Sequence, residues 1–398
     1  MKAIRNVGCA IIFSAALILA VTHAAHSGDA ASPGRDALVR QISLKTPAIG
    51  QSREFAAQRL VASGPRAFIS ANPNPNPWQL LASLPGAVIH DISFSSATTG
   101  YVAAELGQVW KTTDGGNSWT EILNLGFPYY WYGVQAAGSH VVISGFNDSN
   151  FEGIIRWSDD AGMTWSSDVV LTTSGWSDRI HFPNKQDGLV MDQLNLNAAN
   201  AAHYTTDGGQ TATDWTEVVP DADGGWFGDQ FSMLSNLHTR ASGINYCTSA
   251  NGGQVWNCGP SIDSVFDGPT FFVNDKSGWV GGGEISPNVE GWVHTTTDGG
   301  NTWSGRTLDG PWPIREIYFL TPKVGWAAGG NVYTNVGGMD FSSDGGQTWS
   351  VDISTGAEMK SCTSKPVTGG LTVWCAGTSF NGTSFTGVVY GLPVTKTP

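Results

Sequence analysis

The chain has 398 residues, of which 51 are Gly and 17 are Trp, while only 13% are charged. This composition favours short strands joined by tight turns over long helices. Residues 1–70 hold eight Lys and Arg against three Asp and Glu, which leaves 12 against 30, a net charge of −18, on residues 71–398. Such an acidic body argues against nucleic acid and anionic membranes as partners.

The first 25 residues are predicted to be a signal peptide. Lys2 and Arg5 precede an apolar run at residues 9–21, and small residues around Ala24 offer a cleavage site. The run is short for a membrane span, and no other segment approaches the required length. We therefore expect a secreted or periplasmic protein without membrane insertion.

Residues 26–77 are predicted to be a polar spacer. The segment ends in an Asn/Pro linker, NPNPNP at residues 72–77, whose prolines favour an extended chain. The remaining residues, 78–398, are expected to form one domain.

From Trp78 onward the chain repeats. A phrase that ends in Trp recurs at residues 112–119 (TTDGGNSW), 158–165, 205–215, 249–256, 296–303 and 342–349. The closing tryptophans are 41 to 50 residues apart, a period typical of a four-stranded propeller blade. In the first repeat we expect strands at 91–95, 101–105, 109–113 and 119–123.

The repeated phrase resembles the Asp-box, or BNR, repeat. Preceding phrases such as Gly100-Tyr-Val-Ala, Gly278-Trp-Val-Gly and Gly325-Trp-Ala-Ala make the chain most similar to the photosystem II assembly- and stability-factor-like group. Sialidase, sortilin and xyloglucanase propellers are more distantly similar. The resemblance implies an all-β propeller fold, and it implies an assembly or scaffold role on a partner protein as one possible function.

The acidic residues of the repeat are expected to be structural. Each can accept backbone hydrogen bonds in the turn between the third and outer strands, and we assign them neither catalysis nor a metal. They are Asp114, Asp160, Asp207, Asp298 and Asp344.

Seven blades are predicted. Inner-strand phrases begin near Asp91, Tyr132, Arg179, Gln230, Pro269, Arg315 and Met359. The last blade shows only three strands, so Trp78–Leu81 is expected to supply its outer strand and to close the ring between the chain's two ends, which removes the exposed sheet edges.

Four cysteines remain after the signal peptide, which takes Cys9 with it. They form two near pairs, Cys247/Cys258 and Cys362/Cys375, each bracketing a strand–turn–strand. We expect two local disulfides rather than a metal site, because there is no CxxC motif and no nearby His.

A ligand is expected at the face where each outer strand leads into the next inner strand. Four tryptophans recur there with acids and arginines, and the predicted ligand-binding residues are Tyr130, Trp131, Trp176, Arg179, Trp226, Asp229, Trp312 and Arg315. Such a face suits the apolar side of a sugar, and equally a protein segment. The alternative is that these rings seal the joints between blades.

The sequence therefore predicts a monomeric, non-catalytic binding propeller for an extracellular glycan or protein, with no cofactor. A glycoside hydrolase or lyase is the alternative. Glu105 and Glu284 fall at equivalent places in blades 1 and 5, and with Asp178 they are the candidates for general acid or base.

Overall fold

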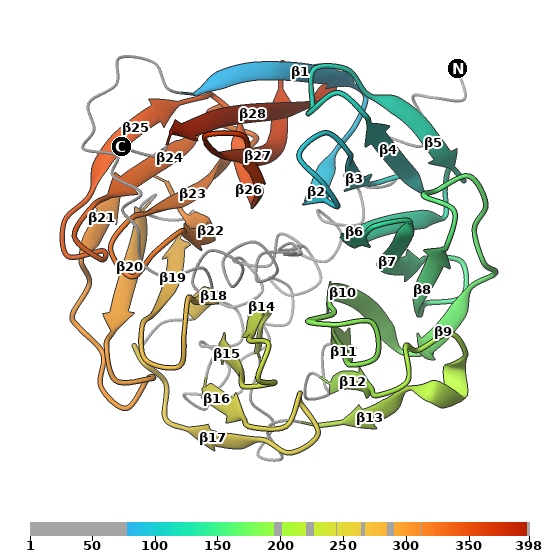
Figure 1. The fold of residues 1–398 in the computed structure, drawn as a ribbon, viewed down its shortest axis with the longest axis horizontal. Helices are drawn as coiled ribbons and strands as arrows, with labels where there is room; N and C mark the ends of the chain where they lie inside the picture. The colour runs from blue at the N-terminus through green and yellow to red at the C-terminus, as the bar shows by residue number, and fades with distance from the viewer. Residues whose placement is uncertain are drawn as a thin grey trace, which may run out of the picture. The chain divides into compact units, whose positions relative to one another are not determined.

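The computed structural model describes residues 78–194, 201–219, 227–243, 245–263, 267–284, 290–310 and 312–395. These residues form seven four-stranded sheets around a common centre (Figure 1). The predicted seven-bladed propeller is confirmed. The predicted signal peptide and spacer lie outside the described residues. Within those residues, no helix has the length and apolar character needed to cross a membrane.

Blades 1 to 3 follow one another in the sequence. Blade 1 contains β2 (Ile89–Phe94), β3 (Gly100–Ala104), β4 (Gln108–Thr112) and β5 (Thr120–Asn124). Blade 2 contains β6 (Tyr129–Ala137), β7 (His140–Asn147), β8 (Glu152–Ser158) and β9 (Val169–Thr172). Blade 3 contains β10 (Gly175–His181), β11 (Gly188–Leu194), β12 (Ala201–Thr205) and β13 (Thr216–Val218), with the 3-10 helix η1 (Ala212–Asp214) in the longer repeat before β13.

Blades 4 to 7 complete the ring. Blade 4 contains β14 (Phe227–Met233), β15 (Thr239–Gly243), β16 (Tyr246–Ser249) and β17 (Asn257–Gly259). Blade 5 contains β18 (Asp267–Phe272), β19 (Gly278–Glu284), β20 (Glu290–Thr296) and β21 (Leu308–Gly310). Blade 6 contains β22 (Ile314–Phe319), β23 (Gly325–Asn331), β24 (Val336–Ser342) and β25 (Ser350–Ser354). Blade 7 contains β26 (Glu358–Val367), β27 (Gly370–Phe380), β28 (Phe385–Thr395) and the first strand, β1 (Gln79–Pro85).

The ring closes between the two ends of the described chain, as predicted. β1 pairs antiparallel with β28 and forms the outer edge of blade 7 (Figure 1). The buried Trp78 precedes β1, and its Nε1 donates to Asp352 Oδ2 at 2.8 Å. The same oxygen accepts from Trp326 Nε1 at 2.9 Å, and the two indoles meet edge to face. Trp78 therefore ties the start of the domain to blade 6 as well.

A Phe–Gly–Trp arrangement joins neighbouring blades. Phe319 ends an inner strand and lies over Gly325 at the start of the second strand, where a Cβ would come within 2.3 Å of the phenyl ring. Trp279 of blade 5 stacks on this Phe319 at 3.5 Å between ring centroids, and its Nε1 donates to the carbonyl of Gly345 at 2.8 Å. The Gly-Trp phrases of the sequence thus lock one blade onto the next.

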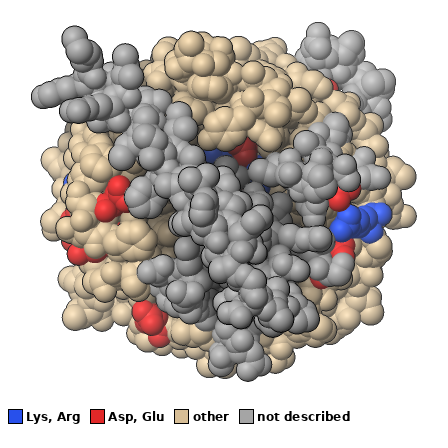
Figure 2. Space-filling view, turned by 180° about the vertical axis from the view of Figure 1, so that it is seen from behind, with Lys and Arg blue, Asp and Glu red and all other residues tan. Residues whose placement is uncertain are grey.

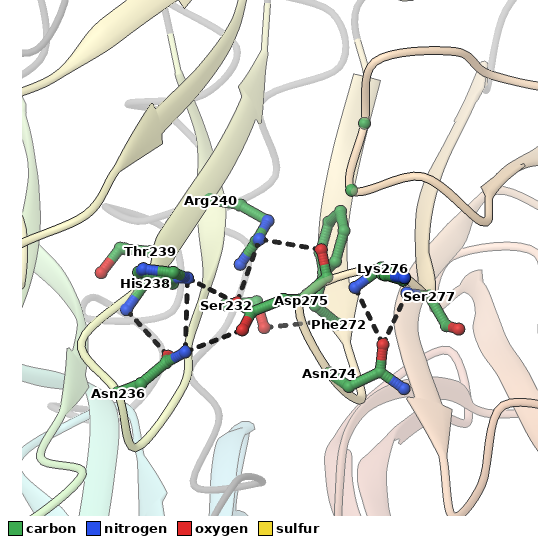
Figure 3. A network of polar contacts seen from close by, with 12 residues as sticks. Ser232, Asn236, His238, Thr239, Arg240, Phe272, Asn274, Asp275, Lys276 and Ser277 are labelled. Atoms are coloured by element: carbon green, nitrogen blue, oxygen red, sulfur yellow. Dashed lines mark hydrogen bonds and ion pairs between the residues drawn. The ribbon is translucent and has the colours of Figure 1, made fainter.

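Arg240 replaces the tryptophan at the joint between blades 4 and 5 (Figure 3). It pairs with Ser232 in the sheet, as Trp279 pairs with Phe271 one blade later. Its guanidinium lies 4.4 Å from the ring of Phe272 and donates to the carbonyl of Asp275 at 3.1 Å. A planar cation can stack on an aromatic face much as an indole does.

The repeated turns hold themselves together through hydroxyl and carboxylate groups. In the first, Thr112 Oγ1 donates to Asp114 Oδ1 at 2.8 Å, and the same oxygen accepts from the backbone N–H of Ser118 at 2.9 Å. These hydrogen bonds, led by those from Ser118, lower the pKa of Asp114 to about 2. The corresponding hydroxyl contact recurs at Asp160, Asp207, Asp298 and Asp344.

Both predicted disulfides are present. Cys247–Cys258 joins β16 to β17, and Cys362–Cys375 joins β26 to β27. Each bond links directly paired residues of neighbouring strands within one blade.

Truncating Trp78 to Ala should open the closure of the ring. The change removes a buried indole and its bond to Asp352, so we expect a loss of about 3–5 kcal/mol in the free energy of unfolding. Leu80→Ala is the matched control on the same strand, because Leu80 is 53% exposed. Urea unfolding of both variants measures the difference. Equal effects would contradict the role of Trp78.

Candidate functional site

All the inner strands begin at the same end of the propeller ring. Neighbouring inner strands are tied in parallel register: the N–H of Val134 donates to Asp91 Oδ2 at 2.8 Å, and the N–H of Ala136 donates to Ser93 Oγ at 3.0 Å. Because the strands of a blade are antiparallel, the end of each second strand and the start of each third strand lie at this end of the ring as well. We call it the channel mouth.

Each of the seven inner strands carries a β-bulge near its start. Five bulges are single residues, one in each of blades 1, 2, 3, 6 and 7: His90, Tyr132, Asp178, Arg315 and Lys360. The bulges of β14 and β18 are longer. A bulge re-aims a side chain out of the regular alternation, and bulges are frequent beside functional sites. The five single-residue positions together are named the bulge arc.

One half of the arc is an alternating charge network between blades 6 and 7. Arg315 Nε donates to Glu358 Oε1 at 2.9 Å, and Lys360 Nζ lies 3.9 Å from Glu358 Oε2. The side chains of Glu358 and Lys360 are almost fully buried, whereas Arg315 retains 11% exposure. Two cations thus share one carboxylate just below the surface.

The other half of the arc centres on His90 in blade 1. Its Nε2 lies 3.2 Å from Glu105 Oε1, and its ring meets Tyr132 of blade 2 edge to face at 4.9 Å. Burial, followed by the charge of Lys360, lowers the pKa of His90. Burial alone would raise the pKa of Glu105, but the bond to His90 and the charges of His90 and Lys360 outweigh it, so this pKa is lowered. Glu105 is therefore an ionised, 29% exposed carboxylate.

The buried carboxylate of Asp91 joins the inner strands beneath the arc through hydrogen bonds. Besides Val134 of blade 2, its carboxylate accepts from Ser361 Oγ of blade 7 at 2.7 Å. Burial raises the pKa of Asp91 to about 6, and the charge of Arg179 opposes this rise. One side chain therefore holds three consecutive inner strands at the depth of the arc.

Basic and acidic groups meet near the centre of the face seen in Figure 2, which is turned away from the viewer in Figure 1. Among the described residues, no group of three or more His, Cys, Asp or Glu is placed to hold a metal ion.

The structure places two of the four predicted tryptophans in the core rather than on the surface. Trp131 is fully buried and Trp312 is 3% exposed. Each ring packs among apolar side chains at a joint between blades, so neither offers a face to a ligand. Trp176 is half-buried and meets Phe146 edge to face. Trp226 lies outside the described residues.

The remaining predicted residues divide between the mouth and the interior. Tyr130 is half-buried and bridges to Glu105 at the mouth, where Arg315 also lies. Asp178 and Arg179 are both buried on β10. Asp229 lies in β14 and Glu284 ends β19, but their side chains lie outside what the structure describes.

Sequence reasoning missed His90, Glu358 and Lys360. The residues around them give no sign of a bulge, but their position at the start of repeated inner strands was a usable signal.

No protein-family model matches the chain, and no curated protein matches it. Solved structures do. A structure described as YCF48 bound to D1 peptide is 20% identical over 80% of this chain and 98% of its own, with a TM-score of 0.57. YCF48 from Cyanidioschyzon merolae is 18% identical over 79% and 98%, with a TM-score of 0.54. The WD40 propeller domain of Doa1 is 12% identical over 79% and 96%, with a TM-score of 0.53. At these identities the likeness supports the fold alone.

The stability of the protein should depend on pH through Asp340, a buried acid beside Trp312. Burial raises the pKa of Asp340 to about 7, so its ionisation costs stability as the pH rises from about 4 to 7. Asp340→Asn removes this cost, and its stability relative to wild type should rise by about 2–4 kcal/mol between pH 4 and pH 8.

Urea unfolding at pH 4.5, 6 and 8 measures this difference. Asp114→Asn is the control, because Asp114 is ionised throughout that range in both folded and unfolded chains, and its effect should not change above pH 5. A pH-independent difference for Asp340→Asn would contradict the assignment.

Proposed function

We propose that this protein is an exported, non-catalytic propeller that binds an extended segment of a partner protein at the channel mouth. The observation that carries the proposal is the bulge arc, in which five blades each place an ionisable residue in a bulge near the start of the inner strand, at the channel mouth.

The chemistry of the mouth suits a polypeptide backbone. An extended segment brings N–H and C=O groups at regular intervals, and each loses free energy if it is buried without a hydrogen-bond partner. Glu105 supplies an acceptor and Arg315 a donor, both reachable from solvent. Glu358 and Lys360 lie directly behind them, so the charges at the opening are held in fixed positions.

A protein is favoured over a glycan because of the tryptophans. Sugar recognition uses flat aromatic faces that are open to the ligand, and the rings of Trp131 and Trp312 are buried. The YCF48 propeller, which is similar in fold, has been solved with a D1 peptide. That structure supports a peptide-binding use of this architecture.

The two disulfide bonds support export. Two disulfides within single blades are compatible with an oxidising compartment outside the cytoplasm. The signal peptide remains a prediction from the sequence. The hydrolase alternative also stays a prediction. Of its candidates, Glu105 and Asp178 have described side chains, and that of Asp178 is fully buried.

A display selection tests the proposal. A random 12-residue peptide library is selected on the immobilised protein, and the enriched peptides are measured by fluorescence anisotropy. Glu105→Gln and Arg315→Gln should each weaken binding about tenfold or more, because each removes a charged contact at the centre of the interface.

Asp159→Asn is the matched control. Asp159 forms a comparable pair with His140, at 2.6 Å, but at the opposite end of the second strand from the mouth. A glycan array and an assay for reducing-end release run beside the selection. Failure to enrich any peptide, together with glycan binding or sugar release, would overturn the proposal.

A further inference from the structure

Resting on the proposed function, we infer that the partner segment is rich in Lys or Arg, and that its cationic side chains bind an aromatic, acidic rim on blades 6, 7, 1 and 2. The rim consists of Tyr333, Phe380 and Phe385 together with the carboxylates of Glu105 and Asp148.

Three aromatic rings form one exposed cluster beside the mouth. Tyr333, from the β23–β24 turn of blade 6, is 64% exposed. Its ring lies 6.3 Å from that of Phe380 in blade 7, and Phe380 lies 4.7 Å from Phe385 across the β27–β28 turn. Both phenylalanines are half-buried, so the cluster has a fixed base and an open face.

Glycines fix the position of this cluster against the charged arc. A Cβ at Gly330 would lie 2.8 Å from Cα of Glu358, and one at Gly337 would lie 2.0 Å from the carbonyl oxygen of Ala357. The hairpin that carries Tyr333 therefore packs backbone to backbone on the start of β26. No side chain fits between Glu358 and this hairpin.

The aromatic cluster lies in the field of carboxylates. Partial burial raises the pKa of Tyr333, and the charges of Glu105 and Glu358 raise it further. These two acids come from blades 1 and 7.

The charged residues in the loops around the rim are all acidic. In blades 6, 7, 1 and 2 the described loops at the mouth contain Glu105 and Asp148 but no Lys or Arg; these loops are residues 86–88, 105–107, 125–128, 148–151, 332–335, 355–357 and 381–384. The cations of the arc, Arg315 and Lys360, lie lower and share Glu358. Residues 71–398 also carry a net charge of −18, which attracts a basic partner over a longer range.

An aromatic face flanked by carboxylates is a typical recognition site for a cationic side chain. The ring quadrupole attracts the cation, and the carboxylate completes its hydrogen bonds. Long Lys and Arg stems can also cover the apolar surface of the phenylalanines. A neutral or acidic segment would gain neither contact.

The peptides from the display selection test the inference. Enriched sequences should carry a net positive charge, and synthetic fluorescein-labelled copies with every Lys and Arg replaced by Gln should bind at least about tenfold more weakly. The double variant Tyr333→Ala/Phe380→Ala should bind the parent peptides more weakly by a similar factor. Raising the salt concentration to 500 mM should also lower the affinity of the wild-type protein, and more so for peptides that carry more charges.

Two variants serve as controls. Met163→Ala removes an apolar side chain that is 78% exposed on a repeated turn, and it should leave affinity unchanged. Tyr333→Phe keeps the ring and should retain most of the binding. Urea midpoints near wild type establish that the double variant is folded.

The outcomes separate the two proposals. Peptides that depend on Glu105 and Arg315 but are neutral or acidic, or that bind the Tyr333→Ala/Phe380→Ala protein as well as wild type, overturn this inference and leave the proposed function standing. A selection that enriches no peptide, with glycan binding or sugar release beside it, overturns both.

Discussion

The closure of the ring is the constraint on which the rest of the structure depends. Each blade packs only against its two neighbours, so the inner strands keep their parallel register only if the first and last blades are also joined. β1 supplies the outer strand of blade 7, while Asp91 binds Ser361 across the same junction. The arc and the aromatic rim both extend across this joint, because each includes residues of blades 6, 7 and 1.

The candidate site arises from a departure from regular sheet geometry. In a regular inner strand, the residues that precede Asp91 and Ser361 would follow the strict alternation of a pleated strand. The bulges at His90 and Lys360 break it at the same depth in both blades. Because the ring brings these bulges together, a local irregularity repeated in every blade becomes a shared cluster of charges.

The architecture could be predicted from the sequence because it is periodic. Regularly spaced Trp-ending phrases predicted the blades, and the missing fourth strand of the last blade predicted closure by the segment at Trp78. The expected first blade lies within two residues of β2 to β5 at every boundary. The pairs Cys247/Cys258 and Cys362/Cys375 were predictable because each spans one hairpin.

The sequence could not distinguish which aromatic residues face solvent. Trp131 lies near the start of the inner strand β6 and Trp312 lies just before β22, and how deeply each ring is buried depends on packing between blades. Tyr333 and Phe380 lie outside the repeated phrase, one on the β23–β24 turn and the other at the end of β27, and the hairpin that carries Tyr333 packs through Gly337 on Ala357. The bulge positions were hidden because a bulge shifts the register without changing the composition.

The central claim is that the partner occupies the channel mouth over blades 6, 7 and 1. Hydrogen–deuterium exchange of the protein with and without a saturating display-selected peptide tests it most directly. The account predicts slower exchange in residues 331–336, 381–385 and 105–108, with no change at residues 138–140 and 158–165. Protection confined to residues 138–140 and the repeated turns, with the mouth unchanged, would contradict it.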